Sequence, residues 1–344
     1  MEYSEKIGKM ECPFCGNQQE VPTADDMIVE NDFREAISLT GQEEGLDKEM
    51  KEIGCDNCGA KTMVEPDKVT VECPFCGSKN INEGAHDTKS IKPQGLIPFS
   101  IDEKKAVKIF EEWIGKGFWQ PSSLKKKVSG VDTIDGVYVP FWTYDAKTAS
   151  NWTADAGYYY YVTETYTDSD GNTKTRQVRK VRWVPASGYY SNFFDDVTVI
   201  ASKGITQKRV EKIYPFDSEK RVNYDPKYLL GKEAEVYALD VEQGFEVADK
   251  IMDDYIKKEI IKRIPGDTYR DLRVRTRKDN ITFKHLLYPI WIAAYIYNDK
   301  SYQVVINGDS GKISGKKPVS TIKIIIAVLL AIAIAVGIYF LVKN

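Results

Sequence analysis

Residues 55–76 read CDNCGAKTMVEPDKVTVECPFC and contain two cysteine pairs, Cys55/Cys58 and Cys73/Cys76, each spaced C-x2-C. Two thiolates on one tight turn can hold a metal ion from one side, and the glycine after each pair lets the backbone turn away. Fourteen residues separate the pairs, which is close to the spacing of a four-cysteine zinc ribbon. The pattern therefore predicts two knuckles joined by a β-hairpin around one tetrahedral zinc ion.

Four thiolates fill the coordination sphere of zinc, so the predicted ion is structural and has no open position for catalysis. It would contribute about 10 kcal/mol to a ribbon that is too small to fold alone. Disulfides are disfavoured in a reducing cytoplasm, and a thioredoxin-like redox site needs a βαβ context. An iron–sulfur cluster normally shows a tighter run of cysteines. Zinc is therefore the ion that we expect.

A third pair, Cys12/Cys15, has no partner pair, because all six cysteines of the chain fall in these three pairs. It is either half of a degenerate first ribbon or a pair that shares zinc with one of the later pairs. His86, one of only two histidines, is a conceivable third ligand. Cys12 and Cys15 are predicted zinc ligands, and the sequence leaves open whether they bind a separate ion.

The C-terminus is a segment of a different kind. From Ile324 to Val342 the chain has nineteen residues without a charge, and an α-helix of this length covers about 28 Å, close to the hydrocarbon thickness of a bilayer. Helix is expected because lipid offers the backbone no hydrogen-bond partner. A buried core helix is the alternative, but such helices seldom reach this length without a polar face. We predict a single transmembrane helix at 322–342.

Lysines predict the orientation of this span. Lys312, Lys316, Lys317 and Lys323 precede it, whereas only Lys343 follows it. The positive-inside rule therefore places the preceding domains in the cytoplasm, and the first residues lack the apolar stretch of a signal peptide. We expect a single-pass, tail-anchored protein of the cell membrane, whose lysines favour an anionic leaflet.

Charge is spread unevenly along the chain. Residues 1–90 carry 9 Lys/Arg and 20 Asp/Glu, a net charge of -11, and the remainder carries 39 basic and 31 acidic residues, a net charge of +8. The hydrophobic fraction of 42% is that of a globular protein, which excludes disorder throughout. An acidic ribbon repels a polyanion, so the front of the chain is poorly suited to nucleic acid.

The middle of the chain contains two similar units. SIDE at 100–103 and DVEQ at 240–243 each have the form of a capping box before an apolar helical stripe. Each helix is followed by an aromatic strand phrase, YVPFW at 138–142 and LYPIW at 287–291. The repeated order of cap, helix and strand suggests an internal duplication, with coincidence of two aromatic-rich strands as the alternative.

Strands are expected to dominate the rest of this region. The stretches 157–167 and 173–184 flank the turn sequence DSDGN and predict a β-hairpin. The fold class is therefore α+β with antiparallel sheets. The predicted organisation is an acidic zinc-ribbon region at 1–84, a linker at 85–95, an α+β domain at 96–318 that is one unit or two similar halves at about 96–210 and 211–318, and the transmembrane helix.

The sequence contains no convincing catalytic constellation. GDSG at 308–311 resembles a serine-protease nucleophile turn, but a triad is defined by geometry, and His285 is the only histidine that could belong to one. Asp168-x-Asp170-Gly171 resembles part of a calcium loop, yet the flanking ligand positions hold Tyr166 and Lys174. The chain is therefore not expected to be an enzyme.

Several phrases together resemble a known bacterial family. They are the double C-x2-C run, IKPQGLIPFSIDEKKAVKIFEEW at 91–113, GVYVPFWTYDA at 136–146, YPIW at 288–291 and VVINGDSGKISGKKPVS at 304–320. The family consists of membrane proteins with transcription-factor-B-type zinc ribbons, often labelled primosomal or helicase-like. Some members are encoded beside a homologue of phage-shock protein A and an SPFH zinc-ribbon protein, and are thought to hold those partners at the bilayer.

The resemblance covers nearly the whole chain. It implies a metal role for Cys55, Cys58, Cys73 and Cys76, and it matches Cys12 and Cys15 to a first knuckle. The missing fourth pair departs from a two-ribbon pattern.

Two functional hypotheses follow. The first is a membrane-tethered cytoplasmic adaptor or scaffold that recruits protein partners to the bilayer. The family resemblance implies that it acts in a membrane-stress response. The second is a membrane-associated nucleic-acid-binding protein of a replication or primosome type, for which Lys125–Lys127 and Arg176–Arg182 are the stretches that could contact phosphate. The acidic ribbon favours the adaptor.

Overall fold

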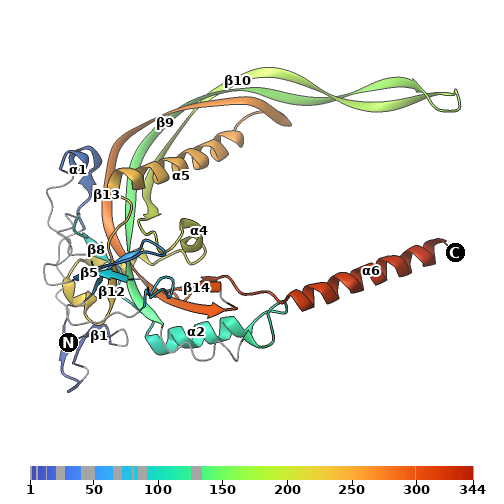
Figure 1. Ribbon diagram of the computed structural model, residues 1–344. Helices are drawn as coiled ribbons and strands as arrows, with labels where there is room; N and C mark the ends of the chain where they lie inside the picture. Colours follow the sequence, from blue (N-terminus) through green and yellow to red (C-terminus); the bar gives the residue numbers. More distant parts are fainter. Residues whose placement is uncertain are drawn as a thin grey trace.

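The computed structural model in Figure 1 describes residues 2–4, 7–12, 14–20, 28–39, 51–64, 72–79, 81–83, 91–124, 134–298 and 300–343. The helices within these ranges are α1 (Phe33–Leu39), α2 (Glu103–Gly115), α4 (Gln207–Val210), α5 (Val241–Ile261) and α6 (Thr321–Lys343), with 3-10 helices η1 (Ser218–Lys220) and η2 (Pro226–Leu229).

The strands fall into two sheets. A three-stranded sheet near the N-terminus has the order β1-β2-β3, and the remaining strands belong to one large sheet that contains the path β11-β8-β13-β9-β12-β6-β5-β7. The strands are β1 (Glu2–Ser4), β2 (Lys9–Glu11), β3 (Gln18–Gln19), β4 (Asn31–Asp32), β5 (Lys51–Cys55), β6 (Lys61–Val64), β7 (Ile81–Glu83), β8 (Gly95–Leu96), β9 (Asp135–Thr167), β10 (Thr173–Ile200), β11 (Val222–Asn223), β12 (Glu233–Glu235), β13 (Thr268–Tyr297), β14 (Lys300–Asn307) and β15 (Ile313–Gly315).

The two aromatic phrases lie next to each other in the centre of the large sheet. β9 and β13 pair antiparallel, with Tyr138 opposite Pro289 and Pro140 opposite Leu287. In both phrases, the proline lies opposite the residue that stands two positions before the other proline. This matched pairing relates the two phrases by an approximate two-fold axis. The α+β class is confirmed, and so is the antiparallel pairing of the long strands.

Two short strands depart from the antiparallel prediction. β8 pairs in parallel with β13, where Leu96 faces Leu287, and β12 pairs in parallel with β9, where Ala234 faces Tyr138. Each short strand precedes a helix in the chain, β8 before α2 and β12 before α5. The pairing is crossed, because the short strand of each half lies against the long strand of the other.

Equivalent tryptophans complete this crossed arrangement. Trp142 Nε1 donates a hydrogen bond of 2.9 Å to Leu239 O, and Trp291 Nε1 donates one of 2.8 Å to Ile101 O. Each acceptor precedes the N-cap residue of the helix in the opposite half. Matched contacts are consistent with an internal repeat. The repeat itself and the boundary between its halves at 210/211 stay predictions.

Both predicted helices form, but only one is capped as expected. Asp240 accepts from the Gln243 amide and the Gln243 side chain bonds back, which confirms the capping box of α5. In α2 the N-cap is Asp102, which accepts from the Lys105 amide at 2.8 Å, so the prediction of Ser100 was wrong. The Ser100 hydroxyl instead donates to Asp309. Asp102 lies closer to the first turn than Ser100, and an aspartate carboxylate caps a helix as well as a serine hydroxyl does.

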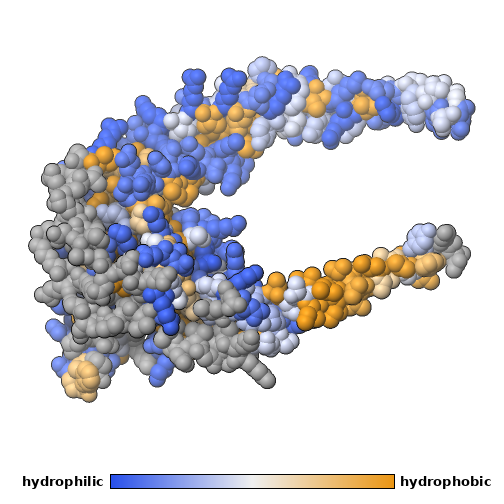
Figure 2. Space-filling view, viewed as in Figure 1, coloured by the Kyte–Doolittle hydropathy of each residue, from blue (hydrophilic) through white to orange (hydrophobic). Residues whose placement is uncertain are grey.

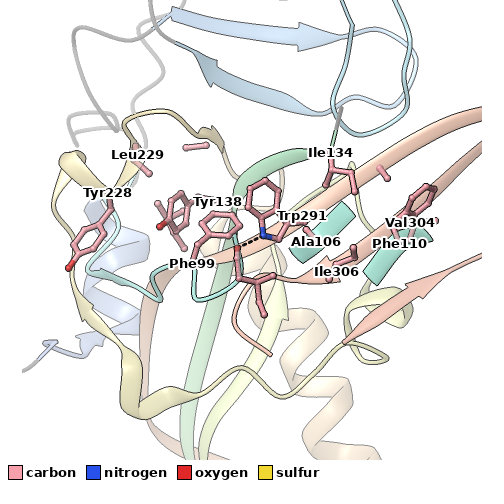
Figure 3. Close-up of a cluster of buried hydrophobic side chains, with 14 of the residues drawn as sticks. Phe99, Ala106, Phe110, Ile134, Tyr138, Tyr228, Leu229, Trp291, Val304 and Ile306 are labelled. Carbon is pink, nitrogen blue, oxygen red and sulfur yellow. Dashed lines mark hydrogen bonds between the residues drawn. The ribbon is translucent and has the colours of Figure 1, made fainter. Parts of the chain in front are cut away.

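The hydrophobic core lies on both faces of the central strands. Figure 3 shows the cluster beneath α2, where Ala106 and Phe110 pack with Trp291, Val304 and Ile306. On the α5 side, Gly244 allows the helix to approach closely, because a Cβ there would lie 2.4 Å from the Tyr144 hydroxyl and 2.6 Å from the Trp142 ring. The core thus holds each helix against the tryptophan that bonds to its N-terminus.

A long β-arm leaves the body. The predicted hairpin is confirmed, but β9 has 33 residues and β10 has 28, far more than the sequence suggested. β13 pairs with β9 only as far as Gly157, so the tip, residues 158–167 and 173–182, is a two-stranded ribbon. Figures 1 and 2 show it reaching far beyond the body, with a mostly hydrophilic surface.

The C-terminal helix stands apart from the core. α6 is apolar enough to cross a membrane from Thr321 to Leu341, and none of that window is buried within the chain. Figure 2 shows it as a continuous hydrophobic rod on the same side of the body as the arm. The alternative of a buried core helix does not apply.

The crossed tryptophan bonds predict matched effects on stability. Replacement of Trp142 or Trp291 by Phe leaves a buried carbonyl, that of Leu239 or Ile101, without its donor. We expect each variant to lose about 1–3 kcal/mol of unfolding free energy, measured by urea denaturation in detergent with circular dichroism. Trp183→Phe on the arm is the control, and a core variant as stable as this control would contradict the role of the bond.

Candidate metal centre

The two knuckles of the cysteine cluster have the same backbone construction. The Cys55 amide donates to Ala60 O at 2.9 Å, and the Gly59 amide donates to Cys55 O at 2.8 Å. The second knuckle repeats both bonds between Cys73, Ser78 and Gly77 at 2.8 Å. The glycines have φ of +75° and +69°, in the left-handed region that side chains rarely adopt, which explains why glycine follows each pair.

The four sulfur atoms form a compact group. Cys55, Cys58, Cys73 and Cys76 place their ligand atoms within 4.8 Å of one another. Cys55 Sγ lies 3.7 Å from Cys76 Sγ, and Cys58 Sγ lies 3.7 Å from Cys73 Sγ. A tetrahedron with zinc–sulfur bonds of about 2.3 Å has edges of about 3.8 Å. The cluster therefore has the dimensions of a four-thiolate zinc site, and no open position for a substrate.

The thiols of the cluster have unequal pKa values. A hydrogen bond from Cys73 lowers the pKa of Cys58 to about 5, and the same contact, together with burial, raises the pKa of Cys73. Burial raises the pKa of Cys76. A divalent ion would stabilise the thiolate form of all four cysteines.

The cluster is built into the large sheet. β6 pairs with β12 through Ala234 opposite Met63, and β12 in turn lies against β9. Phe75 is only 1% exposed and its ring covers Gly204, where a Cβ would lie 2.3 Å from the ring. The Gln303 side chain donates to Phe75 O at 2.6 Å. The metal centre is therefore continuous with the core, while the connecting residues 65–71 lie outside the described residues.

Cys12 and Cys15 form a knuckle of their own. The Cys12 amide donates to Asn17 O and the Gly16 amide donates to Cys12 O, both at 2.9 Å, as in the other two knuckles. Phe14 is 98% exposed, although Phe75 holds the same place in an identical CPFCG sequence. In the part of the chain that the structure describes, Cys12 and Cys15 join no group of three or more possible ligands. Their metal role stays a prediction.

The two histidines are not part of the cluster. His86 lies outside the described residues. His285 is buried, and its Nδ1 lies 2.7 Å from Ile91 O. Its ring packs against Trp142 and Tyr237, and its Nε2 has no hydrogen-bond partner among the described residues. Burial lowers the pKa of His285 to about 4, so the neutral imidazole belongs to the core.

A second acidic group was not foreseen from the sequence. Asp145, Asp195 and Asp196 lie close enough to bind an ion. However, the Lys284 ammonium lies 2.9 Å from Asp196 Oδ1 and 3.7 Å from Asp145 Oδ2, and Arg221 lies 2.6 Å from Asp196. Lys284 and Arg221 thus already pair with Asp145 and Asp196, so the group is part of an ion-pair network, which far-apart sequence positions could not reveal.

The GDSG turn is a structural connection. Asp309 is buried and accepts from Lys220 at 2.5 Å and from the Asp217 amide at 3.1 Å. Asn307 donates to Ile213 O and Pro215 O. These bonds hold the 213–220 segment against β14.

Comparison with known proteins gives one distant relative. The chain is 26% identical over 244 residues to a Bacillus subtilis (strain 168) protein described as "Uncharacterized protein YdjG". The aligned region covers 68% of this chain and 66% of the relative, just under two thirds of its length. No family model and no solved structure matches the chain. The likeness extends over much of the chain but assigns no activity.

The cluster geometry predicts the metal content. Purified wild-type chain should contain one zinc per chain at the 55–76 cluster, and Cys55→Ser/Cys58→Ser should lose it, because two thiolates cannot fill a tetrahedral site. The matched control, Cys12→Ser/Cys15→Ser, should retain this ion. Elemental analysis checks both, and equal zinc loss in the two variants would contradict the assignment.

The buried histidine predicts a pH dependence. The pKa of His285 is lower in the folded chain, about 4, than in the unfolded chain, about 6.5. Between these values the unfolded state binds more protons, so stability falls as pH drops from about 6.5 toward 4. His285→Phe should show a shallower decline in melting temperature over that window. An identical slope for both proteins would contradict this origin.

Proposed function

We propose that the chain is a membrane-tethered adaptor that uses α6 as its anchor and the β-arm as its recruiting surface for cytoplasmic proteins. The 55–76 cluster would be a zinc ribbon that stabilises the body behind the arm. The observation that carries the proposal is the tip of the arm, a two-stranded ribbon of exposed aromatic and basic side chains far from the core.

The tip offers two open strand edges. Beyond Gly157, β9 pairs only with β10, and β10 pairs only with β9, within the described residues. Unpaired edges present a row of backbone donors and acceptors to which an extended peptide can add a strand. Charged side chains along such edges discourage indiscriminate pairing. The tip is therefore suited to a selected protein partner.

One face of the tip resembles a protein-binding patch in its chemistry. Arg179 lies opposite Tyr161 and Val181 lies opposite Tyr159, so these four side chains share a face. Tyr161 is 66% exposed, and the Arg179 guanidinium lies 4.2 Å from the centre of the Tyr159 ring. Tyrosine and arginine are enriched at the energetic centres of protein interfaces.

The arm is also where nucleic acid could bind under the alternative hypothesis, because its β10 strand is rich in lysine and arginine. Many of these cations already have acidic partners. Glu164 lies within 3.1 Å of Lys180 and 3.5 Å of Arg176, and Asp168 lies 2.8 Å from Lys174. Phosphate binding requires cations that can neutralise the backbone of the nucleic acid. The internal pairing supports the protein adaptor, and the basic 125–127 stretch lies outside the described residues.

A pull-down from detergent-solubilised membranes tests the arm. We expect the full-length chain to capture proteins, with homologues of phage-shock protein A and SPFH zinc-ribbon proteins as the candidates implied by the family resemblance. The variant Tyr159→Ser/Tyr161→Ser/Arg179→Ser should lose at least ten-fold in capture, because it removes the side chains that can anchor a partner.

Thr165→Ser/Thr175→Ser, a pair opposite each other on the same face, is the matched control and should capture as the wild type does. Binding of duplex DNA should be measured in parallel at several salt concentrations. Equal capture by all three proteins would contradict the role of the arm. Tight DNA binding with a steep salt dependence would favour the nucleic-acid hypothesis.

A further inference from the structure

The loop after α2 lies at the base of the apolar helix. Residues 116–120 contact the segment that leads into α6, where the Ser320 amide donates to Trp119 O at 2.7 Å. Ser320 also begins the helix, since its carbonyl accepts from the Ile324 amide. Trp119 and Ser320 are 201 positions apart in the sequence, yet the loop lies beside the first turn of α6.

Three consecutive carbonyls of this loop are satisfied by that first turn. Lys323 Nζ donates to Phe118 O at 3.0 Å and to Gln120 O at 2.8 Å, and the Ser320 amide binds the carbonyl between them. An unsatisfied carbonyl is costly to remove from water. Because these three have partners, the loop backbone can enter the interfacial region of a bilayer at little cost.

Two aromatic side chains of the loop are exposed, although the Lys323 ammonium lies 5.5 Å from the centre of the Phe118 ring. Phe118 is 73% exposed and Trp119 is 47% exposed, and the two rings contact each other edge to face. Val319 and Ile322, in the segment that the loop contacts, are also exposed, by 61% and 69%. Four exposed apolar side chains thus lie on the loop and on the segment that begins α6. Tryptophan beside the end of a span is typical of the membrane–water interface.

Two of the lysines before the span also make contacts within the chain. Lys317 Nζ donates to Lys116 O at 2.6 Å and lies 4.1 Å from the centre of the Trp113 ring, and Lys323 bonds to the loop. Among the four expected to face lipid headgroups, these two hold the loop against the helix. Both contacts hold the backbone that carries the two aromatic rings close to the start of α6.

We infer that Phe118 and Trp119 form an interfacial anchor that inserts into the bilayer beside α6 and fixes the body against the membrane surface. The inference rests on the proposed membrane tether, because it needs α6 to be in lipid. Its partner is the boundary between headgroups and acyl chains, which accommodates an amphipathic indole and an apolar phenyl ring. α6 alone would leave the body free to pivot, whereas a second contact restricts it.

Tryptophan quenching tests the anchor directly, since α6 contains no tryptophan. The full-length chain is reconstituted into vesicles of phosphatidylcholine and phosphatidylglycerol, with or without lipids brominated near the headgroup end of the acyl chains. We expect these lipids to reduce the emission of the wild type and of the control Trp183→Phe, and Trp119→Phe to lose most of that reduction. Retained zinc verifies that each variant is folded.

The outcomes separate the anchor from the tether. Flotation of the vesicles on a density gradient first reports whether the chain is membrane-bound. A chain that floats but shows no quenching, or a Trp119→Phe variant that is quenched as strongly as the wild type, overturns the anchor and leaves the tether standing. A chain that does not float overturns both.

Discussion

The structure depends on the antiparallel pairing of β9 with β13. That pairing brings two similar aromatic phrases side by side at the centre of the sheet, although 149 positions separate their prolines. Each tryptophan then reaches the N-terminus of the helix that belongs to the other half. Each of α2 and α5 therefore packs against the tryptophan that follows the other helix in the chain.

The cysteine cluster extends this core. Its strands join the sheet through β12, which lies between β6 and β9, and Phe75 of the second knuckle packs on Gly204. Binding of a metal to the cluster would stabilise the folded chain relative to the unfolded chain. This stabilisation would extend to the edge of the central sheet. The N-terminal knuckle has the same backbone bonds, but its phenylalanine lies in solvent. Its sequence is identical, and only its surroundings differ.

The sequence predicted local features well. The C-x2-C-G knuckles, the capping box of α5 and the apolar C-terminal helix depend on residues close together in the chain, and the structure contains all three. The length of the arm was missed, because alternation of residue types weakens where both faces of a ribbon are exposed. The Lys284 network and the contact of Ser320 with Trp119 join distant segments. Periodicity carries no information about such contacts.

The arm and α6 extend from the same side of the body in Figure 1. The arm carries many charged side chains, and charged side chains are energetically costly to place in hydrocarbon. The arm therefore cannot accompany α6 into lipid, and insertion must widen the angle between them. The ribbon has a register irregularity between Phe194 and Val197 where it can bend, whereas the loop contacts hold the base of α6. The inclination of the arm would then differ between the inserted and the free chain.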